Sequence, residues 1–510
     1  MAPEMTSMQR KRWALVATII ASSMTFIDGT VVNVALPALQ SSLNATITDV
    51  QWVVEAYALF LGALILVGGS LGDQLGRKKV FLFGVALFTA ASMVCGLAPT
   101  PLILIIGRAI QGIGAAFLVP GSLAIISATY DGAERGRAIG TWSGFSAITT
   151  AIGPVIGGWL IEHVSWRAAF FVNIPLAAAV ILLSLAFIDE SSDPSRGRRI
   201  DLAGAAIAVL GLSGVVLGLL EWPPLGATHP LVVGSLMVGT VGLVLLPVVE
   251  ARRQDPMLPL EPFRSRAFTA ANLLTLFLYG ALGLMMFLLP INLIQVQGFT
   301  PTAAGAALVP FAVLMFAVSR WSGGLVERVG SRLPLTVGPA ITAVGFVLLA
   351  RSGIGRSYWT AFFPGIVVMG VGMAITVAPL TTTVMGAVDQ RHAGVASGVN
   401  NAVSRIAGLL AIAAFGVVLT RGFERRLQPT LRELDPASRA QLQGEIKKLA
   451  GAKVPDPKAQ SAVRTAFDGT YRVVMLEAAA LVLLAAFAGL AIGDGRQVTP
   501  APESPSRRPA

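Results

Sequence analysis

Two residues in the middle of long apolar segments could carry charge-based chemistry. Asp28 lies about fifteen residues into the first apolar run, roughly 22 Å along it at a rise of about 1.5 Å per residue. Arg108 lies inside the fourth run, and Gln111 follows one turn later. An ionised side chain at the centre of a span costs about 2.5–3.5 kcal/mol, so such residues normally face a cavity or a partner. We expect Asp28 to exchange a proton for a cationic substrate, Arg108 to stabilise a carboxylate, and Gln111 to add a hydrogen bond in the same cavity. The alternative is that both charges form purely structural pairs.

Three more charges in apolar runs are candidates for the same work. Glu55 lies near the outer end of the second run between aromatic residues typical of a membrane interface, which predicts an acid in an outer vestibule that attracts cations. Glu477 is the only charge well inside the last run and is either a substrate contact or a paired acid. Arg405 lies early in the thirteenth run and is either a site residue or the edge of a cytoplasmic surface.

The composition explains why these charges stand out. Of 510 residues, 54% are hydrophobic and 13% are charged, whereas a soluble protein carries about 25% charged residues. One cysteine and three scattered histidines support neither a disulfide scaffold nor a metal site. No phosphate-binding Gly-x-x-x-x-Gly-Lys-Ser/Thr loop occurs, so we expect no cofactor and no use of ATP hydrolysis as an energy source. The net charge of +11 comes from short basic clusters between apolar runs, a pattern typical of a polytopic membrane protein and not of a nucleic-acid binder.

Fourteen apolar runs are long enough to cross the roughly 30 Å hydrocarbon core as helices. They lie near residues 13–37, 50–70, 80–98, 101–126, 137–162, 168–189, 203–222, 230–250, 268–291, 303–322, 333–352, 358–381, 394–420 and 470–492. The loops on one side carry most of the Arg and Lys, and the short loops on the other side hold Arg167, Arg351 and Arg356. The positive-inside rule therefore predicts a multi-pass protein of the bacterial cell membrane with both termini in the cytoplasm.

These runs predict an all-α fold of two six-helix halves with two inserted central spans. The predicted divisions are a cytoplasmic N-terminus at 1–12, an N-terminal half at 13–189, an inserted pair with flanking loops at 190–267, a C-terminal half at 268–492 that contains an extracellular loop at 421–469, and a cytoplasmic tail at 493–510. In that loop Asp435-Pro436 and Gly451 predict the start and end of one amphipathic helix over the outer mouth, whose apolar face would hold Leu442, Ile446 and Leu449. The alternative is a loop without structure.

A charged loop after the second run is repeated, with changes, in the second half. Asp73 and Arg77 are four residues apart, so they can pair on one helix face, and Gly69 and Gly76 permit close helix approach and a tight turn. The segment 323–332 repeats this order of glycine, acid and base. Parallel repeats with a substrate site near the midplane are a transporter architecture. The loop is interpreted as a lock between helix ends, or alternatively as ordinary solvated charge.

The fifth run contains a second candidate for conformational gating. Pro154 removes one helix hydrogen bond, and Gly153, Gly157 and Gly158 let this span press against a neighbour. We interpret this stretch as a dry helix–helix contact, a seam, which favours exchange of substrate for protons over leakage through the protein. The alternative is ordinary packing of small residues.

These segments together resemble the major facilitator superfamily. Residues 69–78 resemble its loop between the second and third spans, residues 108–114 its fourth-span motif, and residues 153–158 its fifth-span antiporter motif. Residues 26–37 resemble the first-span motif of the 14-span drug:proton antiporters, which Trp166, Arg167, Asn173 and Pro175 also fit. The sequence departs from the pattern at Thr149, at 405–408, and at Glu327 and Ser331 in the later loop. The resemblance implies a major facilitator fold and a role for Arg108 in coupling.

The residues and the resemblance together predict a transporter and not an enzyme. We expect a proton-coupled exporter of amphipathic, cationic drugs, dyes or antibiotics that works by alternating access, with protons, the small-molecule drug and the bilayer as partners. Nothing in the sequence requires a periplasmic adaptor. The alternatives are a dedicated exporter of one endogenous metabolite, lipid or antibiotic, and a membrane enzyme or scaffold. An enzyme would need clustered His, Asp or Cys at a membrane face, which the sequence lacks.

Overall fold

The computed structural model describes residues 7–192, 201–253, 256, 258, 260–388 and 393–493. Most of the predicted cytoplasmic tail at 493–510, Arg391 and the side chain of Glu327 lie outside this description. Within it, fourteen helices are long and apolar enough to cross a membrane, which confirms the predicted number of spans. All the elements of the described ranges are helices.

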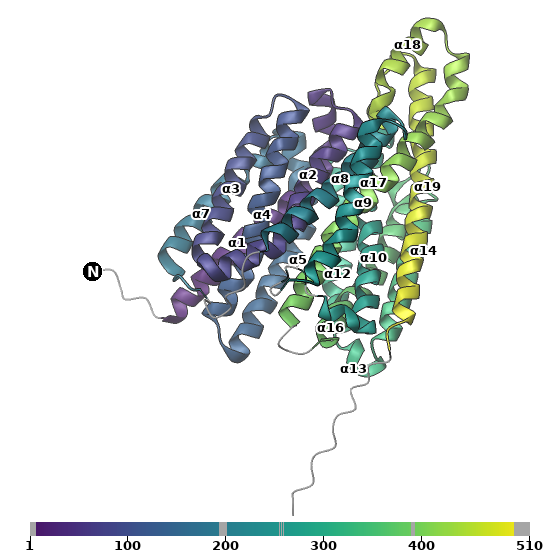
Figure 1. Ribbon diagram of the computed structural model, residues 1–510. Coiled ribbons are helices and arrows are strands. Elements are labelled where there is room, and N and C mark those ends of the chain that lie inside the picture. Colours follow the sequence, from purple (N-terminus) through teal and green to yellow (C-terminus); the bar gives the residue numbers. More distant parts are fainter. Residues whose placement is uncertain are drawn as a thin grey trace, which may run out of the picture.

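The first group of helices lies on one side of Figure 1. It consists of α1 (Ser7–Leu43), α2 (Ile47–Leu75), α3 (Arg77–Leu97), α4 (Pro101–Thr129), α5 (Gly132–His163), α6 (Ala168–Phe171) and α7 (Asn173–Phe187). Two glycines let α4 approach its neighbours. A Cβ on Gly112 would lie 2.5 Å from the Tyr57 carbonyl oxygen of α2, and a Cβ on Gly114 would lie 2.6 Å from the Phe88 nitrogen of α3. The backbones of α2, α3 and α4 are therefore close enough for short polar side chains to meet between them.

The second group forms the other side of the bundle. It consists of η2 (Glu261–Arg264), α10 (Arg266–Ile291), η3 (Asn292–Val296), α11 (Pro301–Ala306), α12 (Val309–Ser322), α13 (Leu325–Val329), α14 (Arg332–Leu349), α15 (Tyr358–Ala361), α16 (Phe363–Gly386), α17 (Ala393–Glu433), α18 (Pro436–Glu445), η5 (Ile446–Gly451) and α19 (Pro457–Leu490). The two groups meet where α17 packs along α2 and where the short helix α11 packs against α5.

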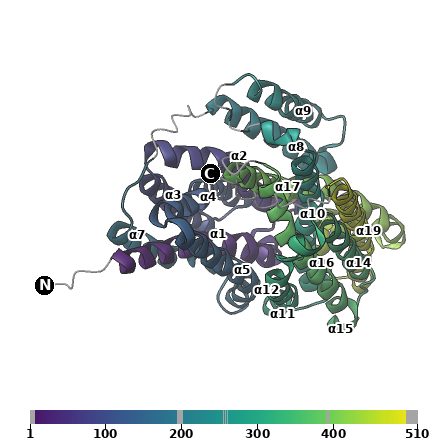
Figure 2. The same cartoon turned by 90° about the horizontal axis from the view of Figure 1, so that it is seen from below.

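The two helices between these groups lie at the periphery of the bundle. They are α8 (Leu202–Leu225) and α9 (Pro230–Glu250). Viewed from below, they form a separate pair outside α2 and α17 (Figure 2). Leu212, Val216 and Leu220 of α8 are buried in one cluster with Leu59 of α2 and Leu409 of α17. The helix α8 thus covers the line along which the two halves touch.

The segment 421–469, which was predicted as an extracellular loop with one short helix, contains more helix than expected. The helix α17 continues to Glu433, and α19 begins at Pro457. Phe423, Leu427 and Leu431 repeat every four residues and are buried. Hydropathy alone misses such a helix because its mean is polar, although one face is apolar.

The short helix predicted inside that segment is confirmed. Asp435 caps α18 by accepting from the backbone N–H groups of Ala437 and Ser438 at 2.9 and 3.0 Å. Leu442 and Leu449 are buried on the predicted face. The following η5 lies against α1 and η3, where Gln40 donates to the Lys448 carbonyl at 3.1 Å.

Candidate functional site

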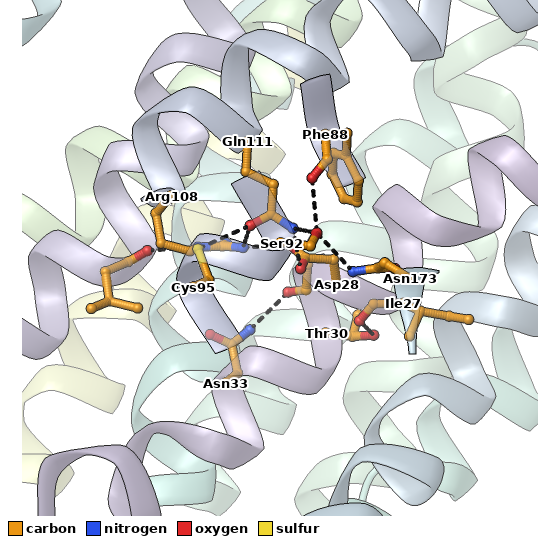
Figure 3. Close-up of polar contacts among 12 residues, drawn as sticks. Ile27, Asp28, Thr30, Asn33, Phe88, Ser92, Cys95, Arg108, Gln111 and Asn173 are labelled. Carbon is orange, nitrogen blue, oxygen red and sulfur yellow. Dashed lines mark hydrogen bonds and ion pairs between the residues drawn. The ribbon is translucent and has the colours of Figure 1, made fainter. Parts of the chain in front are cut away.

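Asp28 lies in a buried polar network within the first group of helices (Figure 3). Its side chain is fully buried, and Arg108 is only 1% exposed. Both carboxylate oxygens of Asp28 are used: Oδ2 accepts from Nη1 of Arg108, and Oδ1 accepts from Nε2 of Gln111 at 2.8 Å. The structure therefore brings together the three residues that the sequence marked as coupling candidates, from helices α1 and α4.

Arg108 is also fixed to helix α2. Its Nε donates to the Val53 carbonyl at 3.0 Å, and its Nη1 donates to Oε1 of Gln111 at 2.7 Å. The guanidinium carbon lies 4.2 Å from the centroid of the Tyr57 ring, which is a favourable cation–π distance. A buried charge of this kind is tolerated because its Nε and Nη1 groups have acceptors and an opposite charge is in contact.

A second layer of polar groups from α3 and α7 orients Gln111. Ser92 accepts from Nε2 of Gln111 at 2.9 Å and from Nδ2 of Asn173 at 3.3 Å, while its own hydroxyl donates to the Phe88 carbonyl at 2.9 Å. The amide of Gln111 is therefore held with its nitrogen toward Asp28 and Ser92. Ser92 was not among the residues predicted from the sequence. It could have been found there as a polar residue in an otherwise apolar span.

Glu55 does not lie in an open outer vestibule, so this expectation is wrong. The side chain is fully buried, and neither carboxylate oxygen has a hydrogen-bond partner among the described residues. Its helix neighbours explain the burial. Gln51, one turn earlier, donates to the Ile412 carbonyl of α17 at 3.4 Å, and Leu59, one turn later, packs with α8 and α17. Glu55 thus shares the face of α2 that the covering helices close.

Glu477 borders a different space. It lines a cavity of about 690 Å³ whose walls come from the end of α8, from α17 and from α19. Trp222, Arg421, Arg425 and Arg426 are among the other lining residues, and the lining includes no residue of the first group of helices. The structure therefore does not bring Glu477 to Asp28.

The predicted ion pair in the loop between the second and third spans is formed, but with a different geometry. Asp73 and Arg77 pair at 2.7 Å. They do not share one helix face, because α2 ends before Gly76 and α3 begins after it. Gly76 has a φ of +108°, which favours glycine. The carboxylate of Glu190 accepts from the backbone N–H of Lys78 at 3.0 Å and so ties the start of α3 to the end of α7.

The close approach that was expected at Gly69 is made by its neighbour. A Cβ on Gly69 would meet only the Pro120 side chain at 3.6 Å, an ordinary contact, whereas a Cβ on Gly68 would overlap the Ala116 carbonyl of α4. The one-residue difference follows from the rotation of α2 about its axis, which the glycine pattern alone does not define.

The glycines of α5 make contacts with both groups of helices. A Cβ on Gly157 would lie 2.6 Å from Val31 of α1, and Gly153 faces Thr30 of the same helix. Gly158 faces the Pro301 carbonyl of α11, and Gly305 of α11 in turn faces the Pro154 carbonyl. The glycine–proline stretch thus lies where backbone meets backbone across the two halves. This contact supports the interpretation of a tight seam.

The family follows from a comparison of the whole chain with known families. The model of the Major Facilitator Superfamily matches residues 18–412. The chain belongs to this superfamily. It is therefore a multi-pass membrane transporter and not an enzyme, as the sequence predicted.

Several similar members of the superfamily carry names that refer to drug resistance. The chain is 36% identical to the multidrug resistance protein Stp of Mycobacterium tuberculosis, over 83% of this chain and 78% of that protein. It is 31% identical to the tetracenomycin C resistance and export protein of Streptomyces glaucescens, over 79% and 75% of the two chains. The methylenomycin A resistance protein of Bacillus subtilis is 30% identical over 79% and 87%.

Solved structures of other transporters share the fold. A bacterial homologue of the human lysosomal transporter Spinster, in an inward-facing and unoccupied conformation, matches with a TM-score of 0.60 and 18% identity over 94% of this chain and 98% of the other. A peptide transporter in complex with sulfate matches with a TM-score of 0.62 and 13% identity over 96% and 100%. These matches confirm the predicted major facilitator fold.

Proposed function

We propose that the protein is a proton-coupled exporter of amphipathic drugs or antibiotics that works by alternating access. The names of its relatives support drugs as the cargo class. The observation that carries the coupling is the buried Asp28–Arg108 pair, in which both oxygens of a carboxylate inside a membrane span are bound by side chains of α4. Protonation of Asp28 removes its charge and so weakens its contact with Arg108.

The contacts of Arg108 indicate how this change could reach the rest of the molecule. When Asp28 is protonated, the guanidinium keeps the Val53 carbonyl and the Tyr57 ring, both on α2. The helix α2 packs directly against α17 of the other half. The charge state of Asp28 therefore changes which contacts hold α1, α4 and α2 together, and α2 meets the second half. Coupling of proton binding to movement of the halves requires a change of this kind.

The orientation and organisation belong to the same proposal. Both termini lie in the cytoplasm, as the basic residues of alternate loops favour. The halves at 13–189 and 268–492 rock about the site, and the pair within 190–267 stays at their edge. The Asp73–Arg77 pair and the α5 seam stabilise particular states of this cycle. Fusions of a cytoplasm-dependent fluorescent protein to each terminus test the orientation, since fluorescence is expected from both.

The coupling is tested in proteoliposomes with an imposed pH gradient. Wild type should move several drugs against their gradients, and Asp28→Asn should abolish gradient-driven movement while drug binding persists. Asp49→Asn, which alters a capping carboxylate at the outer end of α2, is the matched control and should behave as wild type. Gradient-driven export that continues at the wild-type rate in Asp28→Asn would refute the coupling role. Movement of a single compound from a broad panel would instead favour a dedicated exporter.

A further inference from the structure

A second arginine lies between the two halves and is not part of the Asp28 network. Arg405 belongs to α17, at the point where this helix approaches α2: a Cβ on Gly62 would lie 3.5 Å from the Arg405 Cβ. Its guanidinium carbon lies 5.9 Å from the ring centroid of Phe26 on α1. Phe26 precedes Asp28 by two residues, so an arginine of the second half reaches the helix that carries the coupling acid.

No acid among the described residues neutralises Arg405. Asp28 is occupied by Arg108 and Gln111. Glu55 lies seven residues from Gly62, which is about 10 Å along α2. The charge on Arg405 is therefore in excess, because the Asp28–Arg108 pair already sums to zero.

An unused hydrogen-bond donor also lies on α2, the helix that Arg405 approaches. The Tyr57 hydroxyl is buried and has no partner among the described residues. The Tyr57 ring lies against Arg108, and Tyr57 precedes by five residues Gly62, which faces Arg405. Buried donors normally have acceptors, so this hydroxyl offers an unused hydrogen bond to a molecule bound between the halves.

The surroundings are aromatic and partly open. Phe26 contacts Trp142 of α5 edge to face, with the ring centroids 6.5 Å apart. Asn401, on the turn of α17 that precedes Arg405, is exposed, and Ser404 and Arg405 are half-buried. Rings beside an uncompensated guanidinium provide a site for a flat apolar body with a negative end.

We propose that the region between Arg405, Tyr57, Phe26 and Trp142 binds an amphipathic substrate that has a planar aromatic frame and an anionic oxygen. The anionic oxygen belongs to a carboxylate or a phenolate. The anionic oxygen pairs with Arg405 and accepts from Tyr57, and the frame lies against Phe26 and Trp142. This inference rests on the proposed export function and replaces the cationic cargo expected from the sequence. That expectation counted Glu55 and Glu477 as cavity acids, whereas the first is buried without a partner and the second lines another cavity.

Binding of matched dyes to the purified protein tests the charge preference. The probes are planar three-ring dyes and naphthalene derivatives, each in an anionic and a cationic form, such as fluorescein and rhodamine 6G. Binding is followed by quenching of tryptophan fluorescence at constant pH without a gradient. Wild type should prefer the anionic member of at least one pair. Arg405→Gln should weaken binding of that anion by about 10- to 100-fold, the range expected for a lost hydrogen bond to a charged group, and leave the cation unchanged or improved.

Two further variants separate recognition from folding. Arg405→Lys keeps the charge and should restore most of the anion binding that Arg405→Gln loses. Arg421→Gln removes an arginine from the same helix at the other cavity and should bind like wild type. Wild type that binds none of the anions, or Arg405→Gln that binds the preferred anion as tightly as wild type, overturns the proposal. In either case the proposed export function stands or falls separately, on the gradient-driven transport of Asp28→Asn.

Discussion

The buried pair between Asp28 and Arg108 predicts an asymmetric response to removal of either partner. Arg108→Met leaves Asp28 with Gln111 as its remaining donor and deprives Gln111 Oε1 of the bond at 2.7 Å. Asp28→Asn leaves Arg108 with the Val53 carbonyl, Gln111 and the Tyr57 ring. The arginine therefore keeps more compensation than the aspartate does.

The magnitudes follow from these remaining contacts. Removal of one member of a buried pair costs about 3–5 kcal/mol when it leaves an uncompensated charge, and we expect Arg108→Met to fall in this range at an alkaline pH that keeps Asp28 ionised. Asp28→Asn should cost about 1–3 kcal/mol, since the guanidinium retains acceptors. The double variant should be less destabilised than the sum of the two, with a coupling energy of about 1–3 kcal/mol, as is typical for residues in contact.

The assay is reversible unfolding of the four proteins in mixed micelles, which gives a double-mutant cycle. The matched control is the cycle of Asp73→Asn and Arg77→Met. Both side chains of this loop pair are partly exposed, so its coupling energy should stay below about 1 kcal/mol. A coupling energy near zero for Asp28 and Arg108, or a larger loss in Asp28→Asn than in Arg108→Met, would show that the pair does not stabilise the fold as described.

Three further predictions concern other parts of the molecule. Gly158→Val should reduce transport by about tenfold or more, because its side chain would collide with backbone of α11 at 2.8 Å or less. Gly144→Val, with open space around it, is the control. Equal transport rates in the two variants would contradict the proposed tight contact between α5 and α11. Glu55→Gln should unfold at the wild-type temperature or above it, since the carboxyl has no hydrogen bond to lose. Glu55→Lys should unfold at a lower temperature. A clearly lower unfolding temperature of the Gln variant would show that the carboxyl has a partner. Hydrogen bonds from Ser438 and Ala437 lower the pKa of Asp435. The cap of α18 is therefore fully present above the ordinary pKa of aspartate and is lost as the pH falls through the lowered value. The protection factor of the Ser438 amide against hydrogen exchange should fall only in acid, and Asp435→Ala should lack this protection at every pH.

The sequence by itself determined the number of membrane spans and the family. A helix that crosses a bilayer must be apolar over about 20 residues whatever it contacts, so fourteen spans could be read from local composition. The same local rule marked Asp28 and Arg108, because a charge in such a span needs a partner or a cavity. Asp435 and Leu442 predicted α18 for a similar reason, since capping and helix periodicity are properties of neighbouring residues.

Only the tertiary structure decided which of these residues meet. Asp28 and Arg108 are eighty positions apart in the chain, and their contact depends on the rotation of α1 and α4 and on the glycines that let α4 approach α2 and α3. The same rotations place Glu55 under α8 and α17, turn Gly68 instead of Gly69 toward α4, and leave Glu477 in a separate cavity. Hydropathy is a sum over one helix, whereas each of these outcomes depends on the relative placement of several helices. For that reason the sequence alone predicted several candidate acids but could not distinguish Asp28 from the others.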